Sequence, residues 1–297
     1  MHAAKSSINR SINLILIYRI WFVSVFFGLH TLVLAGEKSL NAELCREVRL
    51  DLEKQSIYTL LPDGSELTNK LRNEPMPELK GSILGQILSR FYKESTGGLE
   101  NWKDVNSVAM SSKYKNAEGE FKHRIIAKKP DFIKVSIYMS NGVYLKSFDG
   151  NHGWEKFPTE QKAKLIRDEQ SLRRLANDSR FMNHLLYPFK KGKAYEYMGI
   201  VRESDSVCHK IRVHTEKHFI MDYFIDVETY LEVKVVQTDS MGYFDRVELN
   251  ISGHKIIEGM PFPIKVETYI NGSWNSELIM EKIETNVGLV NWMFQLN

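Results

Sequence analysis

The sequence has few of the features that mark enzymes and metalloproteins. Its 297 residues include two cysteines, Cys45 and Cys208, whose spacing fits neither a CxxC redox pair nor a zinc cluster. It contains no GxSxG, HExxH or GxxxxGK[ST] motif. No strand–helix–strand rhythm indicates a parallel nucleotide-binding sheet. We therefore expect no enzymatic activity, no catalytic residue and no cofactor.

Net charge is also nearly absent. The chain carries a formal charge of +3, and residues 1–35 hold three basic side chains and no acidic one. Without those three, 37 basic side chains face 37 acidic ones. A neutral body lacks the electrostatic field that attracts proteins to phosphate backbones. Nucleic acid is therefore not an expected partner.

The N-terminal segment has the composition of an export signal. Residues 1–19 are polar and basic, residues 20–34 are mostly apolar, and the small residues Ala35 and Gly36 follow. This order is typical of a secretory signal peptide, so we predict that residues 1–35 are removed by cleavage after Ala35. The apolar run is interrupted by His30 and is shorter than the ~20 residues of a spanning helix. An uncleaved inner-membrane anchor is the alternative.

Export permits a disulfide between Cys45 and Cys208, although two isolated thiols are the simpler interpretation. Residues 36–80 hold three of the eight prolines and few aromatic residues, which is typical of an extended arm. After Ser82, apolar residues recur at helical spacing up to Gly97-Gly98. One amphipathic helix is therefore predicted to open the main domain, residues 81–297.

Most of that domain alternates with the period of two that predicts β-strands. Residues 113–157 read as a meander with a hairpin turn at Asn141-Gly142. Helical spacing returns between Asp168 and Tyr187, before Pro188. Seven strand-like segments follow, at 195–201, 207–213, 219–225, 230–236, 243–251, 264–270 and 274–283.

These patterns predict a mainly β (α+β) fold. We expect a single curved antiparallel sheet of about 10–11 strands that forms an unclosed barrel, with the helices as a lid or plug. A helix lying across the concave face of such a sheet would leave an apolar cavity suited to lipid tails.

Several short motifs support this interpretation by their order along the chain. They are Gly119-Glu120-Phe121 through Lys128-Lys129-Pro130, Phe148 to Trp154, Tyr223 to Leu231, Glu258 to Pro263, and the ending from Thr285 to Phe294. In this order they resemble the LolA/LolB-like superfamily, the bacterial periplasmic carriers that sort lipoproteins to the outer membrane. The resemblance covers about residues 82–297.

The resemblance implies a periplasmic carrier or binder of lipidated proteins or acyl-chain lipids. It implies lipoprotein acyl chains or lipid as partners, with an inner-membrane release complex or an outer-membrane acceptor as further candidates, and a monomer as the expected state. In the carriers an arginine before proline helps to hold the lid closed, and Lys129 stands at the matching position here. Lysine offers a point charge where arginine offers a planar fork.

Alternating apolar residues are the candidates for the cavity, and the helical stripe together with Lys129 supplies the lid. The predicted cavity residues are Ile125, Ile133, Val135, Ile137, Val143, Leu145, Trp154, Met221, Leu231 and Val233. The predicted lid residues are Leu172, Leu175, Met182, Leu185, Leu186 and Lys129.

Two alternative functions remain open at this stage. Relatives of the carriers sense envelope stress by contacting other proteins, and residues 36–80 could serve such an interaction module. On an extended strand His214, Glu216 and His218 would share one face and could hold zinc. The neighbouring basic residues Lys210, Arg212 and Lys217 favour solvated histidines over metal ligands, so no metal site is predicted.

Overall fold

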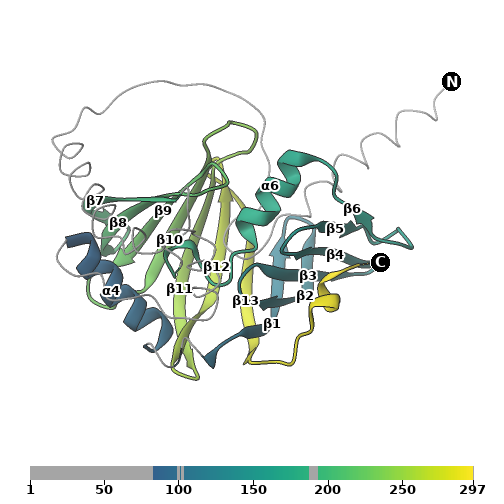
Figure 1. Ribbon diagram of the computed structural model, residues 1–297, viewed down its shortest axis with the longest axis horizontal. Coiled ribbons are helices and arrows are strands. Elements are labelled where there is room, and N and C mark those ends of the chain that lie inside the picture. Colours follow the sequence, from purple (N-terminus) through teal and green to yellow (C-terminus); the bar gives the residue numbers. More distant parts are fainter. Residues whose placement is uncertain (1–82, 99–100, 102–103, 187–192, 297) are drawn as a thin grey trace, which may run out of the picture.

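The computed structural model describes residues 83–98, 101, 104–186 and 193–296. The predicted signal peptide at 1–35, the predicted arm at 36–80 and Cys45 lie outside these residues. Within them, Figure 1 shows one large open sheet bent into two wings, with helix α6 lying between the wings.

Helix α4 (Ile83–Thr96) opens the described chain, as the apolar spacing predicts. Its buried side chains, Leu84, Ile87, Leu88, Phe91 and Tyr92, form one stripe that faces strand β12. The helix ends at Gly97, whose backbone has a φ of 71°. A Cβ at Gly97 would lie 2.3 Å from the carbonyl oxygen of Gly259, so only glycine lets the helix end approach the sheet this closely.

Thirteen antiparallel strands make up the sheet in the described residues, which confirms the predicted fold class with slightly more strands than expected. They are β1 (Ser107–Asn116), β2 (Gly119–Lys128), β3 (Phe132–Met139), β4 (Gly142–Asp149), β5 (Gly153–Lys156), β6 (Lys164–Leu165), β7 (Ala194–Glu203), β8 (Ser206–His214), β9 (Phe219–Asp226), β10 (Glu232–Asp239), β11 (Val247–Ile257), β12 (Met260–Ile270) and β13 (Ser273–Thr285).

The strand order is β6-β5-β4-β3-β2-β1-β13-β12-β11-β10-β9-β8-β7. The first and last strands do not pair, so the sheet is not closed. Strands β1 to β6 form the first wing and strands β7 to β13 form the second wing. The two wings meet where β1 pairs with β13, and this pairing carries a register shift between Ser111 and Ser112. Such irregularities bend strands and increase their twist, which gives the sheet a concave face.

The main core lies on the concave face. Register pairs place Ile125 opposite Val135 and Ile211 opposite Tyr223, and all four side chains are buried in this core. Alternate residues face outward. There Cys208, Phe224 and Val236 form a smaller apolar cluster, and Cys208 is a free thiol.

The C-terminal segment covers part of the outer face. It contains the short 3₁₀ helix η4 (Asn291–Phe294), whose Phe294 ring lies 5.4 Å from that of Phe132. Ser147 donates a hydrogen bond of 2.7 Å to the carbonyl oxygen of Phe294. The predicted ending therefore packs against the sheet.

Helix α6 (Glu169–Asp178) is shorter than the helical pattern up to Tyr187 predicts. Its N-cap, Asp168, accepts a 2.7 Å hydrogen bond from the backbone N–H of Ser171. The helix stops at Ser179, and Met182 has a φ of 65°, which a helix cannot accommodate. The later apolar residues of the pattern form a loop and the 3₁₀ helix η3 (His184–Leu186).

The loop after α6 ties the two wings together. Arg180, 6% of whose side chain is exposed, forms ion pairs of 2.6 Å with Asp131 and 2.9 Å with Glu216. Asp131 lies in the β2–β3 turn and Glu216 in the β8–β9 turn, on opposite wings. Arg173 fixes α6 itself through a 2.8 Å bond to the buried Asp239. The region beneath α6 is thus closed by packed and paired side chains.

Candidate functional site

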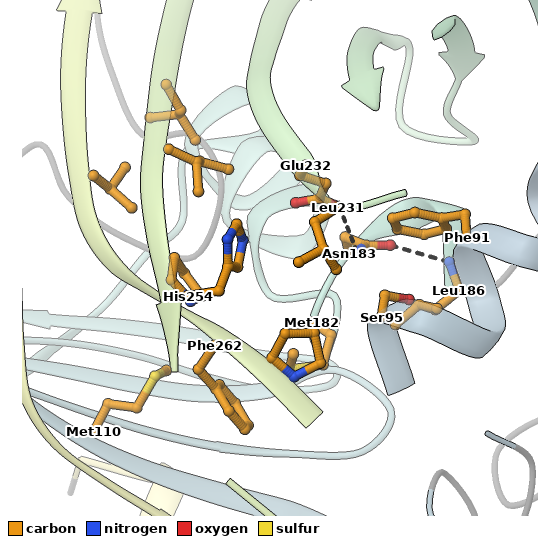
Figure 2. A pocket seen from close by; sticks show the side chains of 15 residues that line it. Phe91, Ser95, Met110, Met182, Asn183, Leu186, Leu231, Glu232, His254 and Phe262 are labelled. Carbon is orange, nitrogen blue, oxygen red and sulfur yellow. Dashed lines mark hydrogen bonds between the residues drawn. The ribbon is translucent and has the colours of Figure 1, made fainter. Parts of the chain in front are cut away.

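An open pocket lies beside the concave face, between α4 and strands β10 to β12. Its empty volume is about 750 Å³, counting the part that opens to solvent. The part that is comparable with measured cavity volumes is about 80 Å³, so the pocket is a small hollow that opens to solvent. The described residues that line it come from α4, β1, the loop after α6 and the second wing (Figure 2). They are Phe91, Ser95, Met110, Met182, Asn183, Leu186, Leu231, Glu232, Leu249, Ile251, His254, Pro261, Phe262, Pro263 and Val266.

Apolar side chains form most of the wall because three elements present their core-facing stripes to the same space. Phe91 belongs to the buried stripe of α4. Leu249 and Ile251 alternate along β11, and Val266 pairs with Ile251 from β12. The wall is therefore a part of the core that the covering elements leave unfilled.

Two prolines explain why the pocket opens at this edge. Pro261 and Pro263 stand in the first part of β12, which pairs with β11, whereas the pairing of β12 with β13 starts at Lys265. Proline has no N–H to donate to a neighbouring strand, so it is tolerated where one side of a strand is unpaired. The early β12 residues consequently form a rim where β12 separates from β13.

Four polar side chains interrupt the apolar lining: Ser95, Asn183, Glu232 and His254. Asn183 connects two of the walls. Its Nδ2 donates a 2.6 Å hydrogen bond to Oε1 of Glu232, and its Oδ1 accepts one of 3.1 Å from the backbone N–H of Leu186. Figure 2 shows both contacts, and it shows His254 and Glu232 at the same open space. The loop after α6 thereby holds the Glu232 carboxyl group in place.

Loss of hydration determines the charge of these groups. Desolvation raises the pKa of Glu232 to about 8. Desolvation also lowers the pKa of His254 below its usual value near 6.5. At neutral pH the carboxyl group is therefore mostly protonated and the imidazole uncharged. The pocket combines an apolar wall with neutral hydrogen-bonding groups.

The structure places the predicted cavity residues in three different environments. Leu231 lines the pocket. Five others are buried in the main core on the concave face and do not contact the pocket, namely Ile125, Ile133, Val135, Ile137 and Met221. This part of the core is filled by packed side chains.

The remaining four predicted cavity residues belong to the opposite face. Val143 and Leu145 alternate with Tyr144, whose ring is in the main core, and Trp154 pairs with the outward Ser147. Val233 packs on the outer cluster around Cys208. Both faces of this sheet carry apolar residues, so alternation alone did not reveal which set faces inward, and the strand register assigns these four to the outside.

The predicted lid residues also divide. Met182 and Leu186 line the pocket. Leu172 and Leu175 of α6 pack over Gly153 of β5, and Leu185 is buried in the core. Lys129 lies with its amino group 5.9 Å from the centre of the Phe181 ring, and burial lowers the pKa of this lysine to about 8.

The main wall residues that sequence reasoning missed come from α4, β11 and β12. Phe91 belongs to the apolar stripe that predicts α4, but it is not among the predicted lid or cavity residues. His254 and Phe262 lie in the segment between the two predicted strands at 243–251 and 264–270. The Pro261-Phe262-Pro263 sequence was the available signal, since two prolines around an aromatic residue indicate a strand that is unpaired on one side.

The histidines considered for zinc do not assemble. Nε2 of His214 lies 3.1 Å from Glu196, Glu216 pairs with Arg180, and His218 has a φ of 60° in a turn. In the described part of the chain, no group of His, Cys, Asp and Glu side chains could hold a metal ion. Neither of its α-helices is long and apolar enough to cross a membrane.

No protein-family model matches the sequence, and no curated protein matches it. Solved structures share the fold. A LolA superfamily protein from Nitrosomonas europaea aligns with a TM-score of 0.52 at 11% identity, over 72% of this chain and 98% of that one. A DUF1329 family protein from Desulfovibrio piger aligns with a TM-score of 0.51 at 11% identity, over 71% and 95% of the two chains. A domain described as an outer membrane lipoprotein-sorting protein from Vibrio parahaemolyticus gives a TM-score of 0.49 at 10% identity, over 71% and 95%.

The fold of this protein is therefore that of the LolA superfamily. The two alignments with TM-scores above 0.5 cover 98% and 95% of the matched chains. This agrees with the resemblance predicted from the ordered motifs.

Proposed function

We propose that this protein is a periplasmic carrier or binder of acyl chains, belonging either to lipids or to lipidated proteins. The observation that carries the proposal is the apolar pocket between α4 and the concave face, with Phe91, Leu249 and Phe262 in its wall. The shared LolA-type fold supports it, and so does the signal-like segment 1–35, which places the protein outside the cytoplasm in this proposal. No step of the proposed function requires catalysis.

Burial of hydrocarbon provides the binding energy. Each methylene that leaves water contributes about 0.8 kcal/mol, so the binding energy grows with the length of chain that the apolar wall covers. Ordering the chain and losing its translational freedom cost several kcal/mol. The remaining affinity suits reversible binding, as a carrier requires.

The test begins with the protein purified from its own cellular compartment and extracted with organic solvent. Mass spectrometry is expected to find acyl-chain lipid or lipopeptide in a ratio near one per protein. Complete absence of bound lipid, together with no binding of any acyl probe at micromolar concentration, would refute the proposal.

A pocket-filling variant makes the test site-specific. Leu231→Trp places an indole in the pocket from a half-buried position, and we expect acyl-probe binding to fall at least tenfold, the equivalent of about 1.4 kcal/mol. Leu165→Trp is the matched control, because Leu165 is 45% exposed on β6 and does not line the pocket. Equal loss in both variants would show that the effect is not local.

The alternative of a stress sensor or protein-interaction module rests on residues 36–80, which lie outside the described residues. Deleting them distinguishes the two functions. A carrier keeps its acyl binding without this segment, whereas an interaction module loses its protein partner.

A further inference from the structure

The described residues that line the pocket include no side chain with a permanent positive charge. Of the described residues in its wall, none is lysine or arginine, and the polar ones are serine, asparagine, glutamate and histidine. The nearby Arg90 of α4 is occupied elsewhere, with its guanidinium 4.1 Å from the centre of the Tyr230 ring. Among the described residues, no ion pair reaches Glu232.

This composition has a consequence for the head group of the bound molecule. A carboxylate or phosphate in the pocket would lose its hydration shell beside another carboxyl group, with no cation among the described lining residues in compensation. An ester or amide has carbonyl oxygens and no charge. A protonated Glu232 and a neutral imidazole of His254 can each donate one hydrogen bond to such an oxygen.

The positions of Glu232 and His254 support an uncharged ester or amide as the head group. Asn183 holds Oε1 of Glu232 through a 2.6 Å hydrogen bond, so the carboxyl group has a fixed position at the start of β10. His254 comes from β11, next to Pro263 in the register of the rim strand. The two groups therefore belong to different strands of one wing and face the same open space, where the head of a molecule would lie while its chain contacts the apolar wall.

We propose that Glu232 and His254 form a polar subsite that selects acyl chains with uncharged ester or amide head groups over free fatty acids. This inference rests on the proposed function, because it identifies the class of acyl compound that the pocket takes. A thioether-linked diacylglycerol on a lipoprotein and a neutral glyceride both belong to this class.

The test compares three probes that have the same chain length and different heads: 1-monopalmitoylglycerol, palmitate and hexadecylamine. Their dissociation constants are measured at pH 7, below their critical micelle concentrations, by displacement of a neutral fluorescent dye. We expect monopalmitoylglycerol to bind at least about tenfold more tightly than palmitate, since an unpaired buried charge costs more than 1.4 kcal/mol.

Variants then connect the selectivity to the two residues. Glu232→Gln preserves shape and neutrality, so the preference is expected to remain. Glu232→Lys adds a cation and should reverse the preference towards palmitate, and His254→Arg provides the same reversal from β11 if the first variant does not fold. Glu118→Lys is the matched control, because Glu118 is exposed in the β1–β2 turn and does not line the pocket.

The outcomes separate the two proposals. Palmitate binding as tightly as monopalmitoylglycerol to the natural sequence would overturn the selectivity while leaving the carrier function intact. Tightest binding of hexadecylamine would also overturn it, because the pocket would then recognise a positive charge. A failure of all three probes to bind would instead overturn the proposed function itself.

Discussion

Arg180 is the side chain that joins the two wings of the sheet. It is almost completely buried and pairs with Asp131 on one wing and Glu216 on the other, at 2.6 and 2.9 Å. Removing one member of a buried ionic network leaves the other charges without compensation. The ion pairs of Arg180 are therefore expected to matter more than the numerous surface pairs of this protein.

Replacing this arginine tests that expectation. Arg180→Met should lower the free energy of unfolding by about 3 kcal/mol, as measured by urea denaturation. Lys265→Met is the control, because Lys265 is partly exposed and its pairs with Glu267 and Glu277 should contribute less than about 1 kcal/mol. Similar effects of the two substitutions would contradict the role assigned to Arg180.

Buried histidines make the stability of the fold depend on pH. His123 shares a 2.8 Å hydrogen bond with Ser112 in the concave face, and burial lowers the pKa of this histidine to about 3. The pKa values of His184, His209 and His254 are lowered for the same reason. Below pH 6.5 the unfolded chain takes up protons that the folded protein does not accept, so acid favours unfolding.

The free energy of unfolding should consequently decrease between pH 6.5 and 5. His123 alone should contribute a slope approaching about 1.4 kcal/mol per pH unit at the acid end of this range. We expect His123→Gln to flatten the curve by that amount, whereas His152→Gln, at an exposed position, should leave the slope unchanged. A curve that stays unchanged in His123→Gln would contradict this explanation.

At the scale of elements, the position of α6 depends on its contact with strand β5. Gly153 of β5 lies directly under it, where a Cβ atom would come within 2.8 Å of Leu175 and 3.2 Å of Leu172. The helix therefore seals one part of the concave face and leaves the pocket to α4 and the second wing.

Adding a methyl group at Gly153 should weaken the packing of α6 on β5. Gly153→Ala is expected to lower stability by about 1–3 kcal/mol through overpacking, with increased hydrogen exchange confined to α6. Gly288→Ala is the matched control, since nothing lies within 4 Å of its added Cβ, and its stability should stay within about 0.5 kcal/mol. Unchanged stability of Gly153→Ala would show that α6 is not held at this point.

Periodicity predicted the elements well, because their apolar stripes are regular. The helix at 83–96, the hairpin at Asn141-Gly142 and the succession of strands along the chain all follow from local patterns. The end of α6 does not follow from such a pattern, because apolar residues continue at helical spacing past Ser179. The ion pairs of Arg180 hold the backbone after the helix in a loop. Here tertiary contacts decide what local spacing leaves open.

The side of the sheet on which a residue lies was harder to predict than the strands themselves. Val143 and Leu145 are as apolar as Ile133 and Val135, yet the C-terminal segment packs against the outer side of this wing and gives its outward residues an apolar environment. Where apolar residues occupy both faces of a strand, alternation does not reveal which set faces the core. The sequence therefore predicted a cavity but assigned it to five residues of the filled core, four residues of the outer face and one residue that lines the pocket.

At the scale of the whole molecule, the two halves of the concave face have different roles. Ion pairs of Arg180 and Arg173 close the half beneath α6, whereas the pocket beside α4 opens to solvent. In the proposed function the closed half is the frame and the open apolar wall is the binding site.

The central claim is that this wall holds an acyl chain, and a crystal structure with bound 1-monopalmitoylglycerol tests it most directly. The account predicts electron density for the hydrocarbon between Phe91, Leu249 and Phe262, with the glycerol head beside Glu232. A chain bound elsewhere on the molecule, or a pocket closed by these same side chains in the presence of saturating lipid, would contradict it.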